Sequence, residues 1–217
     1  MKTEAYGGRR TCVYGNPAAK TVLIQPVDDH DLSVMESEIR RIRALTDTEF
    51  RLIAVRVDDW NHDLSPWSAP AVFGGEGFGD GAEGLLTEVL RLCSDDTGAC
   101  IIGGYSLAGL FALWAGYQTD RFAAVAAASP SVWFPGFMDY MRKGGIRARS
   151  VYLSLGDREE KTKNAVMSTV GRCIREGYGR LKENGVHCTL EWNPGNHFQE
   201  PDLRMAKAFA WAIDSIV

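Results

Sequence analysis

Residues 101–114 decide the fold of this chain, and they read Ile101-Ile102-Gly103-Gly104-Tyr105-Ser106-Leu107-Ala108-Gly109-Leu110-Phe111-Ala112-Leu113-Trp114. The first part is a short apolar run, typical of a buried parallel strand. The last part is rich in Ala and Leu, which favours a helix. The chain must turn between the two within very few residues, and Ser106 stands at that turn. Small residues two positions to either side, Gly104 and Ala108, would let the backbone pass close to neighbouring strands.

A serine at such a corner lies at the N-terminus of a helix, where backbone N–H groups point outward. A serine nucleophile needs this place, because the oxyanion formed on attack must meet donors that are already in position. The pattern Gly-x-Ser-x-Ala, followed by Gly109, departs slightly from the nucleophile elbow Gly-x-Ser-x-Gly. The alternative is an incidental serine in a glycine-rich turn, since short matches of this kind also arise by chance.

The composition indicates an ordinary globular protein. The chain has 217 residues, of which 45% are hydrophobic and 24% charged, and its net charge is −4. This length predicts one domain, residues 1–217, with a single sizeable core. The acidic balance gives no indication of a nucleic-acid or membrane surface. The N-terminus lacks the apolar segment of a signal peptide, and no apolar run has the length of a membrane span.

The cysteine pattern predicts free thiols in a reducing cytoplasm. The chain has five cysteines, an odd number, and no Cys-x-x-Cys pair. The same spacing argues against a structural zinc site. The cysteines are Cys12, Cys93, Cys100, Cys173 and Cys188.

Apolar strands alternate with helical patterns along most of the chain. Six parallel strands are predicted at residues 21–25, 50–57, 100–103, 122–128, 151–155 and 187–192, with a further strand near residues 11–14. Helices are predicted from a Ser33 capping box to residue 45, and over residues 82–93, 106–117, 164–184 and 201–217, with Gly185 as a C-cap. This alternation implies a single, mostly parallel sheet of about six to eight strands with helices on both faces. The chain is too short for a large cap domain, so the long loop at residues 58–81 would control access to a site.

The order of the histidines selects a partner for Ser106. In an α/β-hydrolase the serine, the acid and the histidine follow one another in that order. His30 and His62 precede Ser106, and His187 lies at the start of a predicted strand. His197 lies in a Pro/Gly turn between the last strand and the last helix, at the sheet edge where the base is needed. His197 is therefore the candidate base, and a loop histidine without a role is the alternative.

The acid should follow the strand that ends at Gly156. Three carboxylates stand there, Asp157, Glu159 and Glu160, and spacing alone does not choose among them. The chosen carboxylate would accept the imidazole N–H and stabilise the imidazolium. At least two of the three must be solvated loop residues.

Two backbone N–H groups should form the oxyanion hole. The first is that of Leu107, immediately after the serine. The second should come from the loop expected at residues 26–31, after the first parallel strand. Pro26 has no N–H, so the candidate is Val27.

Aromatic side chains gather in segments beyond the carboxyl ends of the predicted strands. Ligands bind at that edge of open parallel sheets, and aromatic residues there can line an acyl or alcohol pocket. Any one of them could instead fill the core or form the contact of a homodimer. The residues predicted to line the pocket are Trp60, Trp67, Tyr105, Trp133 and Phe198.

Four segments together resemble the esterase branch of the α/β-hydrolases that includes esterase D-like and enterochelin-esterase-like proteins. They are residues 104–109, 129–133, 156–159 and 195–198. The resemblance implies Ser106 as nucleophile and His197 as base. In such proteins the acid commonly stands three residues after the strand-ending glycine, which implies Glu159 here, with Asp157 as a rival. Ala108 replaces a more usual glycine, and residues 25–28 lack the His-Gly sequence of many relatives.

These features predict a serine hydrolase that cleaves a small carboxylic ester through an acyl-enzyme, without metal or cofactor. A short acyl ester, a sugar ester and a siderophore lactone are all compatible with the sequence. An acyltransferase of the same fold, which passes the acyl group to an acceptor other than water, is a variant of this prediction. The alternative from another class is a non-catalytic α/β-hydrolase scaffold that binds a ligand or a partner.

Overall fold

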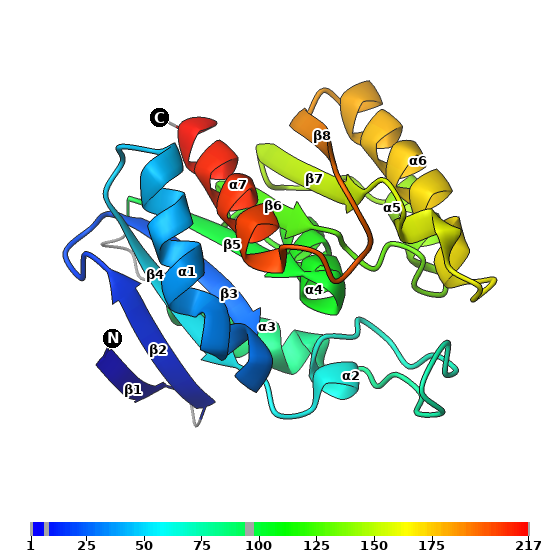
Figure 1. Ribbon diagram of the computed structural model, residues 1–217, viewed down its shortest axis with the longest axis horizontal. Helices are drawn as coiled ribbons and strands as arrows, with labels where there is room; N and C mark the ends of the chain where they lie inside the picture. Colours follow the sequence, from blue (N-terminus) through cyan, green and yellow to red (C-terminus); the bar gives the residue numbers. More distant parts are fainter. Residues whose placement is uncertain (1, 7–8, 94–97, 217) are drawn as a thin grey trace.

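The computed structural model describes residues 2–6, 9–93 and 98–216, and in them eight strands form one sheet (Figure 1). The order across the sheet is β1-β2-β4-β3-β5-β6-β7-β8. β1 and β2 pair antiparallel with their neighbours, and β4, β3, β5, β6, β7 and β8 run parallel. The strands are β1 Lys2–Tyr6, β2 Arg9–Gly15, β3 Thr21–Val27, β4 Phe50–Arg56, β5 Ala99–Tyr105, β6 Ala124–Ala128, β7 Ser150–Gly156 and β8 His187–Asn193.

Helices cover both faces of the sheet (Figure 1). One face carries α1 (Asp29–Leu45) and α7 (Pro201–Asp214), which pack side by side. The other carries α3 (Ala82–Leu90), α4 (Ser106–Gln118), α5 (Phe137–Lys143) and α6 (Val170–Glu183). Three short helices lie in the connections: α2 (Trp60–Asp63), η1 (Glu159–Lys161) and η2 (Met167–Thr169). The predicted mostly parallel sheet between two helical layers is confirmed.

The core explains why the central strands read as continuous apolar runs. Val22 and Ile24 of β3 belong to the core under α3 and α4, whereas Leu23 between them belongs to the core under α1 and α7. Successive side chains of a strand point to opposite faces, and here both faces are buried. α4 is apolar all round, with ten consecutive buried residues after Leu107, because it packs between the sheet and its neighbouring helices.

Two helices begin elsewhere than the sequence predicts. α1 is capped by Asp28, whose Oδ1 accepts the N–H of Asp31 at 2.7 Å, while Asp31 accepts the N–H of Asp28 at 3.3 Å. Ser33, the predicted cap, lies inside the helix and donates to the carbonyl of His30. α6 begins at Val170 because the preceding residues form η2 and irregular turns.

β3 is longer than predicted, and the predicted loop at residues 26–31 is wrong. The pairing of β3 with β5 ends at Ile24, whereas its pairing with β4 continues to Val27. Pro26 is tolerated because β3 has lost one neighbour at that point, so its missing N–H removes no ladder bond on that side. The chain then enters α1 directly after the cap Asp28.

Two of the predicted free thiols are paired. Cys93 and Cys100 form a disulfide that joins the segment after α3 to the start of β5. Their seven-residue separation fits no metal or redox motif, so the sequence did not single them out. Cys12, Cys173 and Cys188 are free.

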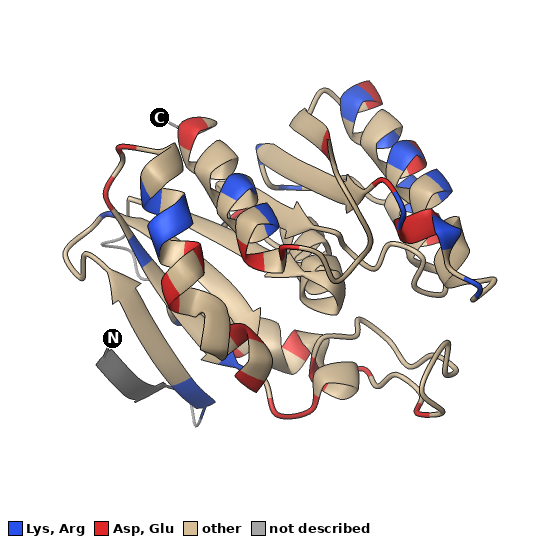
Figure 2. Ribbon diagram, in the orientation of Figure 1, with Lys and Arg blue, Asp and Glu red and all other residues tan. Residues whose placement is uncertain are grey.

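Charges of both signs are interleaved over α1, α6 and α7 (Figure 2). Arg142 reaches from α5 to Glu176 of α6, and Arg41 of α1 binds Asp202 at the start of α7. Among the described residues, no helix is both long and apolar enough to cross a membrane.

Candidate active site

The turn between β5 and α4 has the geometry that its sequence predicts. Ser106 is the first residue of α4 and has a φ of 57°, a left-handed conformation that is strained for a residue with a side chain. A Cβ on Gly104 would lie 2.4 Å from the backbone of Ala108, so the turn requires glycine there. This backbone conformation places the serine side chain beyond the end of β5, at the wall of a cavity.

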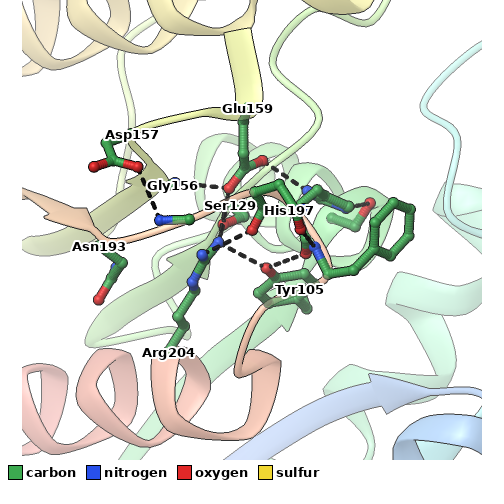
Figure 3. Close-up of polar contacts among 12 residues, drawn as sticks. Tyr105, Ser129, Gly156, Asp157, Glu159, Asn193, His197 and Arg204 are labelled. Carbon is green, nitrogen blue, oxygen red and sulfur yellow. Dashed lines mark hydrogen bonds and ion pairs between the residues drawn. The ribbon is translucent and has the colours of Figure 1, made fainter. Parts of the chain in front are cut away.

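Ser106, His197 and Glu159 form one hydrogen-bonded chain. Figure 3 shows His197 and Glu159 with the contact between them. The Nε2 atom of His197 lies 3.0 Å from the Oγ of Ser106, and its Nδ1 lies 2.7 Å from the Oε2 of Glu159. The three side chains come from the start of α4, the segment between β8 and α7, and η1. Parallel strands bring all three to the carboxyl edge of the sheet. A base oriented by an acid and bonded to a hydroxyl is the arrangement that activates a serine.

Glu159 is a buried carboxylate with both oxygens engaged. Its Oε1 accepts hydrogen bonds from Gly156 N at 2.7 Å, from Ser129 Oγ at 2.8 Å and from Arg204 Nη1 at 2.8 Å. Burial acts to raise the pKa of this carboxyl. The hydrogen bond and charge of His197, with the hydrogen bonds from Gly156 and Ser129, lower the pKa by more than burial raises it, so it lies below its usual value. Glu159 is therefore ionised at neutral pH.

Asp157 and Glu160 face other partners. Asp157 is exposed, and its Oδ1 accepts the backbone N–H of Gly195 at 2.8 Å, which ties the β7 end to the segment before His197. Glu160 binds Arg175 of α6. Of the three predicted candidates, Glu159 is the one that contacts His197.

The two predicted oxyanion donors differ in position. Leu107 is the second residue of α4, so its N–H is one of the helix-end donors without an intrahelical acceptor. Val27 is fully buried as the last residue of β3, in register with Arg56 of β4, and it does not line the cavity. Leu107 is not among the residues that line the cavity either. The strand continues where a loop was predicted, and the Val27 N–H stays a prediction as the second oxyanion donor.

A cavity of about 630 Å³ opens in front of Ser106. Three of the five predicted pocket residues line it: Trp60, Trp133 and Phe198. Two do not. Trp67 packs against Phe134, Phe137 and Tyr140 and donates its indole N–H to the carbonyl of Pro135. Tyr105 lies behind His197 and donates its hydroxyl to the His197 carbonyl at 2.7 Å.

Comparison with known proteins gives structural relatives only. No family model matches the sequence, and no curated protein matches it. An IroE-like serine hydrolase from Shewanella oneidensis superposes with a TM-score of 0.78 at 14% identity, over 97% of this chain and 79% of that one. The siderophore hydrolase EstA from Aspergillus nidulans gives 0.73 at 19% identity, over 99% and 94%. The enterobactin esterase FES from Shigella flexneri gives 0.68 at 15% identity, over 100% of this chain but 59% of that one.

This chain has the α/β-hydrolase fold. The match extends over nearly the whole of it, and the sheet order, the elbow at Ser106 and the edge that carries His197 are those of that fold. At these identities the likeness establishes the fold, and the chemistry must be argued from the site itself.

Two polar residues of this site were not predicted from the sequence. Ser131 is buried, and its Oγ lies 3.4 Å from that of Ser106. Arg204 is 1% exposed and binds Glu159. A signal for Arg204 exists: it occupies the apolar face of α7, four residues before Ala208 and eight before Ala212, where an arginine is unusual.

The described residues around the site form no arrangement of metal ligands. Among the residues that the structure describes, no group of three or more His, Cys, Asp or Glu side chains could hold a metal ion. Both ring nitrogens of His197 have partners, Ser106 and Glu159, and the second oxygen of Glu159 accepts from Gly156, Ser129 and Arg204.

Proposed function

We propose that this α/β-hydrolase is a serine hydrolase that cleaves a carboxylic ester through an acyl-enzyme on Ser106. The observation that carries the proposal is the continuous chain from Ser106 through His197 to the buried Glu159, with contacts of 3.0 and 2.7 Å, at the wall of an open cavity. A non-catalytic scaffold would have no need to keep a strained serine, a base and an ionised acid aligned.

In the proposed reaction the Oγ of Ser106 attacks the ester carbonyl carbon, and its proton passes to Nε2 of His197. Glu159 fixes the tautomer by accepting the Nδ1 hydrogen and stabilises the imidazolium. The Leu107 N–H donates to the oxyanion of the tetrahedral intermediate. The intermediate collapses as the C–O bond to the alcohol breaks, and the alcohol leaves with the proton from His197. Water then attacks the acyl-enzyme by the same sequence of proton transfers, which releases the acid and restores Ser106.

Covalent labelling with a fluorophosphonate tests the proposal. We expect intact-mass spectrometry to find one adduct on the wild-type protein and none on Ser106→Ala, because only an activated serine reacts rapidly with this reagent. Absence of the adduct, or an adduct that persists in Ser106→Ala, would reject Ser106 as nucleophile. EDTA should leave the labelling rate unchanged.

The cavity supports an anionic ester as substrate. Four aromatic side chains line it, and Arg158 and Lys161 line it from the segment after β7. Both cations are exposed, and neither takes part in an ion pair with the described residues. Among the described residues, Glu159 is the only carboxylate that lines the cavity, and it is already bound by His197 and Arg204. Siderophores are suitable first natural esters to test, because two of the structurally similar proteins are a siderophore hydrolase and an enterobactin esterase.

A matched pair of synthetic esters tests the role of the two cations. With Arg158→Gln and Lys161→Gln combined, we expect kcat/KM for p-nitrophenyl hemiglutarate to fall about 10-fold, and for neutral p-nitrophenyl valerate by less than about 2-fold, since exposed charges contribute about 1 kcal/mol each at most. The loss should shrink at high salt. Lys163→Gln, a neighbouring lysine that does not line the cavity, is the control. Equal losses for both esters would exclude an anionic preference.

A further inference from the structure

The guanidinium of Arg204 lies behind the proposed catalytic residues and contacts two of the segments that hold them (Figure 3). Its Nη1 lies 2.8 Å from Glu159 Oε1, 3.1 Å from Ser129 Oγ and 3.1 Å from the hydroxyl of Tyr105. Its Nη2 donates to the carbonyls of Pro194 at 3.1 Å and Asn196 at 2.8 Å. The Arg204 side chain of α7 therefore donates hydrogen bonds both to the acid and to the turn that leads to His197.

Burying the charges of Arg204 and Glu159 costs free energy, because both lose their hydration, so the pair calls for a reason other than stability. Arg204 is 1% exposed, and Glu159 is its only ionic partner among the described residues. The rest of the buried face of α7 is apolar, including Met205, Ala208 and Phe209. A buried ion pair gives little net stability compared with well-packed apolar residues, because both charges lose their hydration. Replacing a buried ion pair by uncharged residues of similar volume is often neutral or stabilising, so stability alone does not account for the pair of Arg204 and Glu159.

The geometry around Glu159 indicates what Arg204 does. The donors on Oε1 anchor that oxygen and leave Oε2 to His197. A Cβ on Gly156 would lie 2.4 Å from the carbonyl oxygen of Gly195, and 3.0 Å from both Oε1 and Arg204 Nη2, so only glycine leaves room for this packing. Tyr105 links Arg204 to His197 in the same way, since its hydroxyl accepts from Arg204 and donates to the His197 carbonyl.

We propose that Arg204 is a positioning residue for the reaction: its guanidinium sets the orientation of the Glu159 carboxylate and fixes the backbone turn that carries His197. This inference rests on the proposed function. Arg204 touches neither the nucleophile nor the space where substrate would bind, and it acts through the acid and the base. Its positive charge balances that of Glu159, so Arg204 and Glu159 together present no net charge to His197.

The pH dependence separates positioning from simple structural support. The charged and titratable groups around His197 are Glu159 of η1, Tyr105 of β5 and Arg204 of α7, with Arg158 and Lys161 at the cavity wall. Asp157 faces Gly195 instead. Removing the Arg204 charge leaves the Glu159 carboxylate uncompensated, which stabilises the imidazolium and moves the onset of activity to higher pH.

For Arg204→Met we expect kcat to fall about 10- to 100-fold with KM changed less than about 3-fold, because a loosened base is misaligned with Ser106. The pH midpoint of kcat should rise by about 1 unit. Arg204→Lys keeps the charge but not the fork, so the midpoint should stay near the wild-type value while kcat remains at least about 5-fold low. Lys207→Met, which removes the α7 cation bound to Glu191, is the matched control and should change neither quantity.

A double-mutant cycle with Glu159→Gln completes the test. If Arg204 acts through Glu159 and His197, adding Arg204→Met to Glu159→Gln should cost less than about 3-fold in kcat, and this variant buries no unpaired charge. Independent, multiplying losses would overturn the inference, as would wild-type kcat and pH midpoint in Arg204→Met. If that variant does not fold, full kcat in Arg204→Lys overturns it instead. Failure of the wild-type protein to react with the fluorophosphonate is a separate result, which rejects the proposed function itself.

Discussion

Ser106→Ala and His197→Ala should each lower kcat for a short-chain p-nitrophenyl ester by about 10⁴- to 10⁶-fold, and the double variant should be scarcely slower than either. The reason is that nucleophile and base act as one unit. Their side chains meet at 3.0 Å, and neither can do its part of the proton transfer without the other. The residual rate of each variant would come from the oxyanion donors and from binding.

Steady-state kinetics on the three variants provides the measurement. Ser33→Ala on α1 and His187→Ala on β8 are matched controls, because both residues are exposed and contribute nothing to the cavity. They should retain wild-type kcat. Losses that multiply in the double variant would mean that the two residues do not act together, and normal turnover in Ser106→Ala would end the proposal.

The strands and the elbow could be predicted because their determinants are local. The apolar run of β5, the small residues around Ser106 and the Ala/Leu-rich start of α4 are contiguous, and each encodes its own backbone conformation. The chain order of the serine, the carboxylates and His197 then indicated which side chains parallel strands would bring to one edge.

Other features depend on contacts that a single sequence does not display. Pro26 marks a turn in most contexts, and it lies in a strand here only because β5 stops pairing with β3 at Ile24. Trp67 turns into an aromatic cluster with α5 rather than into the cavity. The partnership of Arg204 with Glu159 joins residues 45 positions apart on separate elements, so only the folded chain reveals it.

The two candidate acids, Glu159 and Asp157, can be told apart by how much kcat falls when each loses its charge. We expect Glu159→Gln to lower kcat by about 10³- to 10⁴-fold, because an amide cannot stabilise the imidazolium and favours the wrong tautomer. Asp157→Asn should cost less than about 10-fold, since the amide oxygen can still accept the N–H of Gly195. Parallel kcat measurements on the two variants decide the matter. A much larger loss in Asp157→Asn would assign the acid to Asp157 and make our assignment wrong.

Thermal unfolding across pH gives Glu159→Gln an independent readout. The pKa of Glu159 is lower in the folded than in the unfolded protein, so its charge contributes stability above the unfolded value, and this contribution is lost as pH falls through the folded value. Glu159→Gln also leaves the buried Arg204 without its counter-charge. The deficit in Tm relative to the wild type should therefore be largest near neutral pH and should shrink in acid. A Tm deficit that does not change with pH would mean that the Glu159 carboxylate is not the ionised partner on which the proposed mechanism depends.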